Sequence, residues 1–106
     1  MSSEPMWCLV MFDLPTQTKA QRKEYTRFRN VLLDLGFSMV QYSVYVYYSP
    51  SGLIGTRLVK GIKEQLPPGG EVRIFHLTDN QWAKAIRFFN AKEEKPEPEP
   101  EQLMIF

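Results

Sequence analysis

The chain has 106 residues, of which 43% are hydrophobic and 24% are charged, and its formal net charge at pH 7 is +1. This length fits one domain with a single core, and the hydrophobic content excludes a disordered chain. No apolar run approaches the roughly 20 residues of a membrane span, no secretory signal pattern is present, and a single cysteine excludes an internal disulfide. We therefore expect a soluble protein of the cytoplasm.

Charge is distributed unevenly along the chain. Residues 1–92 hold 12 Lys and Arg against 7 Asp and Glu, a net charge of +5, whereas residues 93–106 hold 1 against 5, a net charge of −4. A basic body favours contacts with phosphate groups, but a solvated basic surface produces the same excess. Charge alone leaves both interpretations open.

The first two predicted elements are a strand and a helix. Residues 6–13 are almost continuously apolar up to Asp13, as in a central strand that is covered on both faces. The helix follows because Thr18 and Gln21 have the spacing of a capping box, and apolar residues recur at helical spacing as far as Gly36. Glycine after the last apolar turn is a common helix stop.

Residues 37–48 are rich in Val and Tyr but too long for one strand, so we expect two strands with a tight turn near residues 41–43. Ser49-Pro50-Ser51 is predicted to open a second helix, which ends at the Pro-Pro-Gly-Gly run of residues 67–70. The loop after that run leads into the last part of the domain.

The remaining elements complete a recognisable order. A fourth strand is predicted over residues 71–77, a short helix begins at Thr78, and a short fifth strand is predicted over residues 86–90. The order β-α-β-β-α-β, with extra strand at the C-terminal end, predicts an α+β ferredoxin-like fold for residues 1–90.

The C-terminal part of the chain differs in character. Residues 91–101 alternate acid with proline, which predicts an extended linker. Residues 102–106 are strongly apolar and are predicted to be a docking strand that adds to a sheet edge, in this chain, a second copy or another protein. The alternative is a frayed terminus on the domain's own surface. The docking residues are Leu103, Met104, Ile105 and Phe106.

Asp13 is the first candidate for chemistry. It precedes Leu14-Pro15, so its carboxylate is expected at the carboxyl end of a strand, where open α/β sheets tend to place their sites. One carboxylate is a poor ligand set for a divalent cation, but a two-fold homodimer would supply a second Asp13 and a shared site that activates water against a phosphodiester. The alternative is an aspartate that shapes the turn through hydrogen bonds to the backbone.

The first predicted helix carries the candidates for nucleic-acid binding. They lie within about three helical turns, as phosphate contacts require, although a solvated basic face is the alternative. These residues are Lys19, Arg22, Lys23, Arg27 and Arg29. Four tyrosines over residues 42–48 could stack on bases, but alternating aromatic residues in a strand favour a core or an interface.

Three segments together resemble the Cas2 family of small CRISPR adaptation proteins. The similarity extends over about residues 6–90, and the Asp-Leu-Pro form and the apolar C-terminal end are most similar to members from type II systems. The segments are Val10-Met11-Phe12-Asp13-Leu14-Pro15, the basic helix with Phe28-Arg29, and Gly36-Phe37 followed by Val40-Gln41-Tyr42-Ser43-Val44-Tyr45.

The resemblance implies a homodimer that bridges two dimers of the CRISPR integrase during spacer acquisition and supports the duplex DNA of the new spacer. It also implies a metal-dependent endonuclease acting on RNA or DNA, in which Asp13 is catalytic and holds Mg²⁺ or Mn²⁺ with the partner's Asp13. Thr16 stands where many members have a further acidic residue. The C-terminal strand, residues 102–106, would pair with the integrase or close the sheet of the dimer.

Two other functions remain as alternatives. One is a stand-alone metal-dependent endoribonuclease of the toxin type, since the virulence-associated D toxins resemble this chain in fold. The other is an RNA-binding ferredoxin-like module, although residues 44–48 lack the Gly-aromatic-Gly pattern of such modules.

Overall fold

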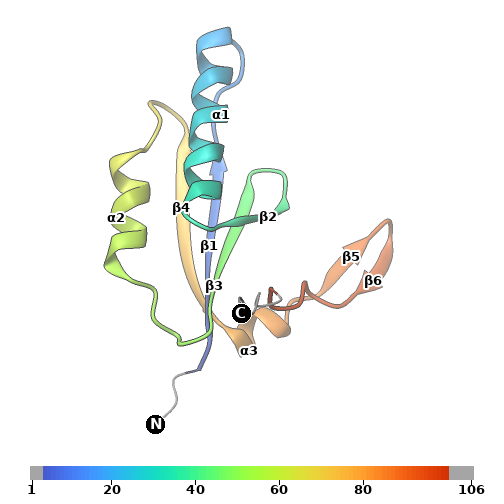
Figure 1. Cartoon of the computed structure of the whole chain (residues 1–106). Coiled ribbons are helices and arrows are strands. Elements are labelled where there is room, and N and C mark those ends of the chain that lie inside the picture. The colour runs from blue at the N-terminus through green and yellow to red at the C-terminus, as the bar shows by residue number, and fades with distance from the viewer. Residues whose placement is uncertain (1–3, 101–106) are drawn as a thin grey trace, which may run out of the picture.

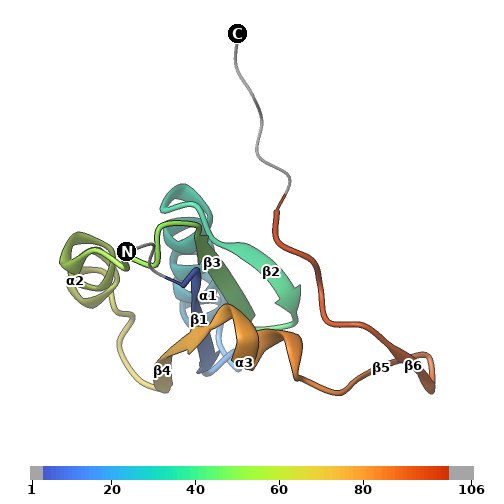
Figure 2. The same cartoon turned by 90° about the horizontal axis from the view of Figure 1, so that it is seen from below.

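A four-stranded antiparallel sheet is the centre of the fold in the computed structural model, which describes residues 4–100 (Figure 1). The helices α1 and α2 lie on one face of the sheet, and the short α3 lies on the other (Figure 2). The strand order β2-β3-β1-β4 confirms the ferredoxin-like arrangement. These elements are β1 (Met6–Asp13), α1 (Lys19–Asp34), β2 (Ser38–Gln41), β3 (Val44–Ser49), α2 (Thr56–Glu64), β4 (Glu71–Thr78) and α3 (Asp79–Ala83).

The strand β1 pairs on both sides, with β3 and with β4. Because strand side chains alternate between faces, every second residue of β1 points into the core beneath α1 and α2. On the other face Trp7 is buried against Tyr48 and Trp82, whereas Leu9 is half-buried and Met11 is exposed. The expectation that β1 is covered on both faces is therefore met on the core face, and on the other face only around Trp7. The buried core consists of Cys8, Val10, Phe12, Leu14, Phe28, Leu32, Phe37, Tyr45 and Ile62.

Two capping boxes start helices where the sequence predicts them. At α1 the Thr18 hydroxyl accepts the backbone N–H of Gln21 at 3.1 Å, and the Gln21 side chain accepts the backbone N–H of Thr18 at 3.0 Å. Thr78 and Gln81 repeat this arrangement at α3. Each box satisfies backbone donors that the first helical turn leaves unpaired. Both predicted helix starts are confirmed.

The predicted division of residues 37–48 is also confirmed. The strands β2 and β3 are joined by a tight turn at Tyr42 and Ser43, and the pairing of β2 with β3 shifts register between Met39 and Gln41. Ser43 adopts a φ of 64°. A left-handed residue next to a bulge is one way to reverse the chain without glycine.

The predicted start of the second helix is wrong. The helix α2 begins at Thr56 after Gly55, not at residues 49–51. The Ser49 hydroxyl donates to the carbonyl of Leu53 at 2.8 Å, and the Ser51 hydroxyl accepts the N–H of Leu53 at 3.3 Å. Serine side chains that bond nearby backbone in this way stabilise a turn in place of a helix.

A hairpin of β5 (Arg87–Phe89) and β6 (Lys92–Glu94) projects from the body in both views (Figures 1 and 2). Asn90 and Ala91 join its strands with φ values of 53° and 63°, as a two-residue hairpin turn requires. The predicted fifth strand is therefore present, but it pairs with residues for which the sequence predicts an acidic linker. Within residues 4–100, no helix is both long and apolar enough to cross a membrane.

Cys8 is fully buried in the core between β3 and β4. Burial raises the pKa of its thiol to about 11, so the thiol keeps its proton at neutral pH and is a poor nucleophile. Cys8 therefore contributes to the packing of the core.

Gly70 allows the loop before β4 to approach the end of β1 closely. Its φ is +73°, and a Cβ there would clash with the carbonyl oxygen of Asp13 and lie 2.8 Å from Leu14 Cδ2. Gly69 has a similar φ of +76°, but its nearest neighbour, Pro15 Cγ, is 3.6 Å away. The two glycines therefore have the same backbone conformation, but only Gly70 lies too close to the end of β1 to accept a Cβ.

We expect Gly70→Ala to lower the free energy of unfolding by roughly 3 kcal/mol and Gly69→Ala by about 1 kcal/mol. Only the first substitution adds a steric clash to the backbone strain. Urea unfolding followed by circular dichroism measures both values. Equal effects would mean that the loop does not lie against Asp13.

Candidate functional site

Asp13 is the last residue of β1, and its side chain is exposed. It belongs to the face opposite the core, since Phe12 points inward. In the pairing of β1 with β4, Asp13 lies directly opposite Glu71. Directly opposite residues of an antiparallel pair have Cβ atoms roughly 5 Å apart. The sheet therefore brings a second carboxylate beside Asp13 that sequence spacing does not reveal.

A cleft of about 250 Å³ opens beside these two carboxylates. Arg73 Nη2 lies 2.7 Å from Glu71 Oε1, so an arginine pairs with one of the two acids. The cleft thus combines a carboxylate, an ion pair and the turn between β2 and β3. Its lining residues are Met11, Phe12, Asp13, Tyr42, Ser43, Val44, Glu71 and Arg73.

The donors at this cleft fit a divalent cation only in part. Carboxylate oxygens are the ligands that Mg²⁺ and Mn²⁺ prefer. Within residues 4–100, however, no three His, Cys, Asp or Glu side chains gather at one place. Asp13 and Glu71 would need further oxygens from water, substrate or a second copy of the chain. Among these residues the Asp13 carboxylate accepts no hydrogen bond from a backbone N–H, so the turn-shaping alternative gains no support.

The tyrosines predicted to form a core or an interface have different surroundings. Tyr45 is buried and stacks on Phe12, Tyr47 packs against Phe37, and Tyr48 lies against Trp7. Tyr42 is the exception, because 78% of it is exposed. All four tyrosines therefore lie against other aromatic rings, since Tyr42 stacks on Tyr25, but of the four Tyr42 alone remains largely in solvent at the rim of the cleft.

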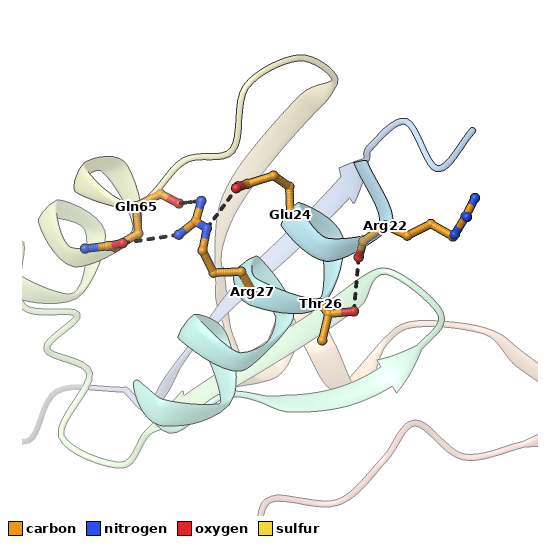
Figure 3. Close-up of polar contacts among 5 residues, drawn as sticks. All are labelled: Arg22, Glu24, Thr26, Arg27 and Gln65. Atoms are coloured by element: carbon orange, nitrogen blue, oxygen red, sulfur yellow. Dashed lines mark hydrogen bonds and ion pairs between the residues drawn. The ribbon is translucent and has the colours of Figure 1, made fainter. Parts of the chain in front are cut away.

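The basic residues of α1 do not form one face. Arg22 and Arg27 point to opposite sides of the helix (Figure 3). Arg27 pairs with Glu24 at 2.9 Å and donates to the side chain and the carbonyl of Gln65 at 3.2 and 3.1 Å. Its guanidinium therefore connects α1 to the end of α2. The N–H groups of Arg27 that the sequence predicts to bind phosphate therefore take part in contacts within the fold.

The other predicted nucleic-acid-binding residues keep more of their donors available. Within the described part of the chain, Arg22 donates through one nitrogen, Nη1, to the carbonyls of Thr16 and Gln17, and Arg29 Nε donates to the Tyr45 hydroxyl at 3.0 Å. Lys19 and Lys23 are exposed. Sequence reasoning missed a second basic group on α2, on the same face of the sheet. Its exposed members are Arg57, Lys60 and Lys63.

The acidic segment after β6 contacts the body of the domain. Trp82 Nε1 donates to the carbonyl of Glu97 at 2.8 Å, and the Tyr48 hydroxyl donates to Glu99 Oε2 at 3.0 Å. Trp82 is itself stacked on Trp7, with ring centroids 4.4 Å apart. The predicted linker is therefore attached at two places. The predicted docking residues, Leu103, Met104, Ile105 and Phe106, lie outside the residues that the structure describes.

Comparison with known proteins adds a finding that geometry alone does not give. Residues 6–85, which run from β1 through α3, match the model of a family described as CRISPR associated protein Cas2. The chain belongs to the Cas2 family. This confirms the resemblance read from the Asp-Leu-Pro and Gln-x-Ser-Val segments at the level of the family, while the likeness to type II members stays a prediction.

Several Cas2 relatives are similar over nearly the whole chain. A protein from Paracidovorax avenae is 45% identical over 101 residues, covering 95% of this chain and 94% of its own length. One from Parvibaculum lavamentivorans is 42% identical, covering 95% and 100%, and one from Flavobacterium psychrophilum is 37% identical, covering 95% and 88%. Each of these three is named CRISPR-associated endoribonuclease Cas2.

Replacing Arg27 by alanine is expected to lower the free energy of unfolding by about 1 kcal/mol, because the contacts joining α1 to α2 are lost while their exposure keeps each contribution small. Lys23→Ala is the matched control. Lys23 is exposed on the same helix and makes no ion pair within the described part of the chain, so we expect a change below about 0.5 kcal/mol. Thermal unfolding measures both, and equal losses would contradict a structural role for Arg27.

Proposed function

We propose that this Cas2 chain is a dimeric, cytoplasmic subunit of CRISPR adaptation. In this role, two copies form a platform that bridges two dimers of the CRISPR integrase and supports the duplex DNA of a new spacer. Family membership supports a CRISPR-associated role and favours it over a toxin-type ribonuclease or an RNA-binding module. The main observation in support of a dimer is the exposed apolar surface on the face of the sheet opposite α1 and α2.

This apolar face continues from the sheet onto the projecting hairpin. Met11 and Phe75 are 39% and 41% exposed on the sheet, and Ile86 and Phe88 are 75% and 67% exposed beside it. Contiguous apolar surface of this kind marks an interaction site in a water-soluble domain. In a dimer with two-fold symmetry, the same patch of each copy would be buried against the other copy. The hairpin of each copy would then reach towards its partner.

The opposite side of the molecule is suited to duplex DNA. The helices α1 and α2 form the layer that a dimer through the open face leaves exposed (Figure 2). This layer carries the exposed Lys19 and Lys23 of α1 and the exposed basic residues of α2. Contacts between such cations and phosphates release counterions, so the affinity for a duplex should fall steeply with salt. Dimerisation and duplex binding thus use different faces. The C-terminal strand, residues 102–106, stays a predicted docking segment for the integrase.

Replacing Phe88 by glutamate is expected to convert the dimer to a monomer at micromolar concentration, because a charge would be buried in the interface. Duplex affinity at low salt should fall with it, since a monomer presents half of the basic surface. Sedimentation and fluorescence anisotropy measure the two effects. Leu53→Glu is the control, because Leu53 is 74% exposed but lies in the loop before α2. A dimeric Phe88→Glu variant with unchanged duplex affinity would refute the proposed interface.

A second candidate function is metal-dependent cleavage of RNA or DNA. It is favoured by the register that sets Glu71 beside Asp13 and by the endoribonuclease names of the relatives. Asp13, with the partner's Asp13, would hold Mg²⁺ or Mn²⁺. Such an ion, when bound, activates water and neutralises charge on a phosphodiester. The chain's own contribution is to hold the carboxylate at a rigid strand end and to place Arg73 near the substrate's phosphate.

Asp13→Asn separates the two functions. We expect it to lower the rate of phosphodiester cleavage by on the order of 100-fold, because the amide is neutral and a weak metal ligand. Assembly with the integrase and insertion of a duplex should stay at the wild-type level. Asp34→Asn, an exposed aspartate at the end of α1, is the control for loss of charge.

These measurements use purified chain, integrase and duplex DNA, with complex mass and spacer insertion as readouts. Cleavage that persists at the wild-type rate in Asp13→Asn would exclude Asp13 as the catalytic residue. Loss of insertion in the same variant would contradict the expectation that insertion does not need the Asp13 carboxylate.

A further inference from the structure

Tyr42 is the most exposed large apolar side chain among residues 4–100. One face of its ring stacks on Tyr25, with centroids 5.7 Å apart and an angle of 19° between the rings. The Tyr25 hydroxyl is hydrogen-bonded to Ser43 Oγ at 2.8 Å, and burial raises the pKa of Tyr25. Tyr42 is therefore supported from one side by a fixed ring, while its other side remains in solvent.

The turn that carries Tyr42 is attached to the strand end that carries Asp13. The backbone N–H of Phe12 donates to the carbonyl of Ser43 at 3.1 Å. Ser43 holds a φ of 64°, a conformation that costs a residue other than glycine roughly 1–3 kcal/mol. Backbone strain of this kind is maintained only where the surroundings fix it. The position of the Tyr42 ring relative to Asp13 is thus set by covalent and hydrogen-bonded neighbours.

The cleft between Tyr42 and β4 has both an aromatic and a cationic wall. Arg73 uses Nη2 on Glu71, which leaves other guanidinium donors of a side chain that is 58% exposed. A volume of about 250 Å³ is below the ~300–1,000 Å³ of pockets for free small molecules. An aromatic wall, a cationic wall and this size suit one unit of a longer chain that carries a planar ring and a negative charge.

We propose that Tyr42 stacks on one unpaired base of the nucleic acid that the Asp13 cleft receives, while Arg73 contacts its phosphate. This inference rests on the proposed cleavage function and names the residue that positions its substrate. A base within a duplex already stacks on its neighbours, so this cleft receives a single strand or a frayed end. Duplex DNA binds instead at the basic layer of α1 and α2.

The test measures binding without cleavage, in EDTA. The first probe is a fluorescent single-stranded decamer of adenosine nucleotides, and the second is an abasic decamer with the same phosphates and no bases. We expect Tyr42→Ala to weaken binding of the first probe by roughly 5- to 150-fold and to leave binding of the second unchanged. Tyr42→Phe and Tyr42→Trp keep an aromatic ring and should therefore bind the adenosine decamer with nearly the wild-type affinity.

Of two further variants, one tests the cationic wall and the other is a control away from the cleft. Arg73→Gln should weaken both probes alike and reduce the salt dependence of binding, because it removes a phosphate contact. Leu53→Ala, which removes exposed apolar surface far along the chain from the cleft, should change neither. The mass of each variant in solution is measured alongside.

Two outcomes would overturn the role of Tyr42. One is equal affinity of wild type and Tyr42→Ala for the adenosine decamer. The other is a Tyr42→Ala variant that becomes monomeric and loses affinity for both probes equally, since the ring would then belong to the dimer interface. If no variant cleaves in Mg²⁺ or Mn²⁺ while Tyr42→Ala still loses only base-dependent binding, the cleavage function fails and the stacking role stands.

Discussion

The pairing of β1 on both of its edges is the constraint on which the rest of the molecule depends. Antiparallel registers with β3 and β4 fix which residues of the three strands are neighbours. One face of β1 then receives α1 and α2 and forms the core. The same registers set Glu71 opposite Asp13 at one end of the strand and Trp7 beside Tyr48 at the other. The candidate catalytic cleft and the place where the acidic segment is attached therefore lie at opposite ends of β1.

Local signals were sufficient to predict much of the fold. The capping box of Thr18 and Gln21 and the apolar run of residues 6–13 depend on neighbours close in sequence, and the helix and the strand that they predict are both present at these positions. The predicted start of α2 is wrong because the side chains of Ser49 and Ser51 hydrogen-bond to the backbone of Leu53 and so favour a turn over a helix. The helical spacing of apolar residues gives no sign of these bonds.

For a related reason, the sequence predicts only part of the candidate site. Asp13 follows from its place at a strand end, but its neighbour Glu71 follows from strand register, which joins residues distant along the chain. In the same way, the contacts of Arg27 with Gln65 span two helices, so a list of basic residues cannot separate it from Lys23. Charge patterns indicate which residues are polar, while tertiary contacts decide which remain free to bind.

The attachment of the acidic segment to Trp82 and Tyr48 also has a geometrical meaning. The Trp82 ring nitrogen holds the carbonyl of Glu97, and the Tyr48 hydroxyl holds the carboxylate of Glu99, so two neighbouring positions of the segment are fixed against the domain. The segment therefore leaves the domain from a defined point beside Tyr48, at the end of the sheet opposite Asp13. In a two-fold dimer, two such points would be held a constant distance apart.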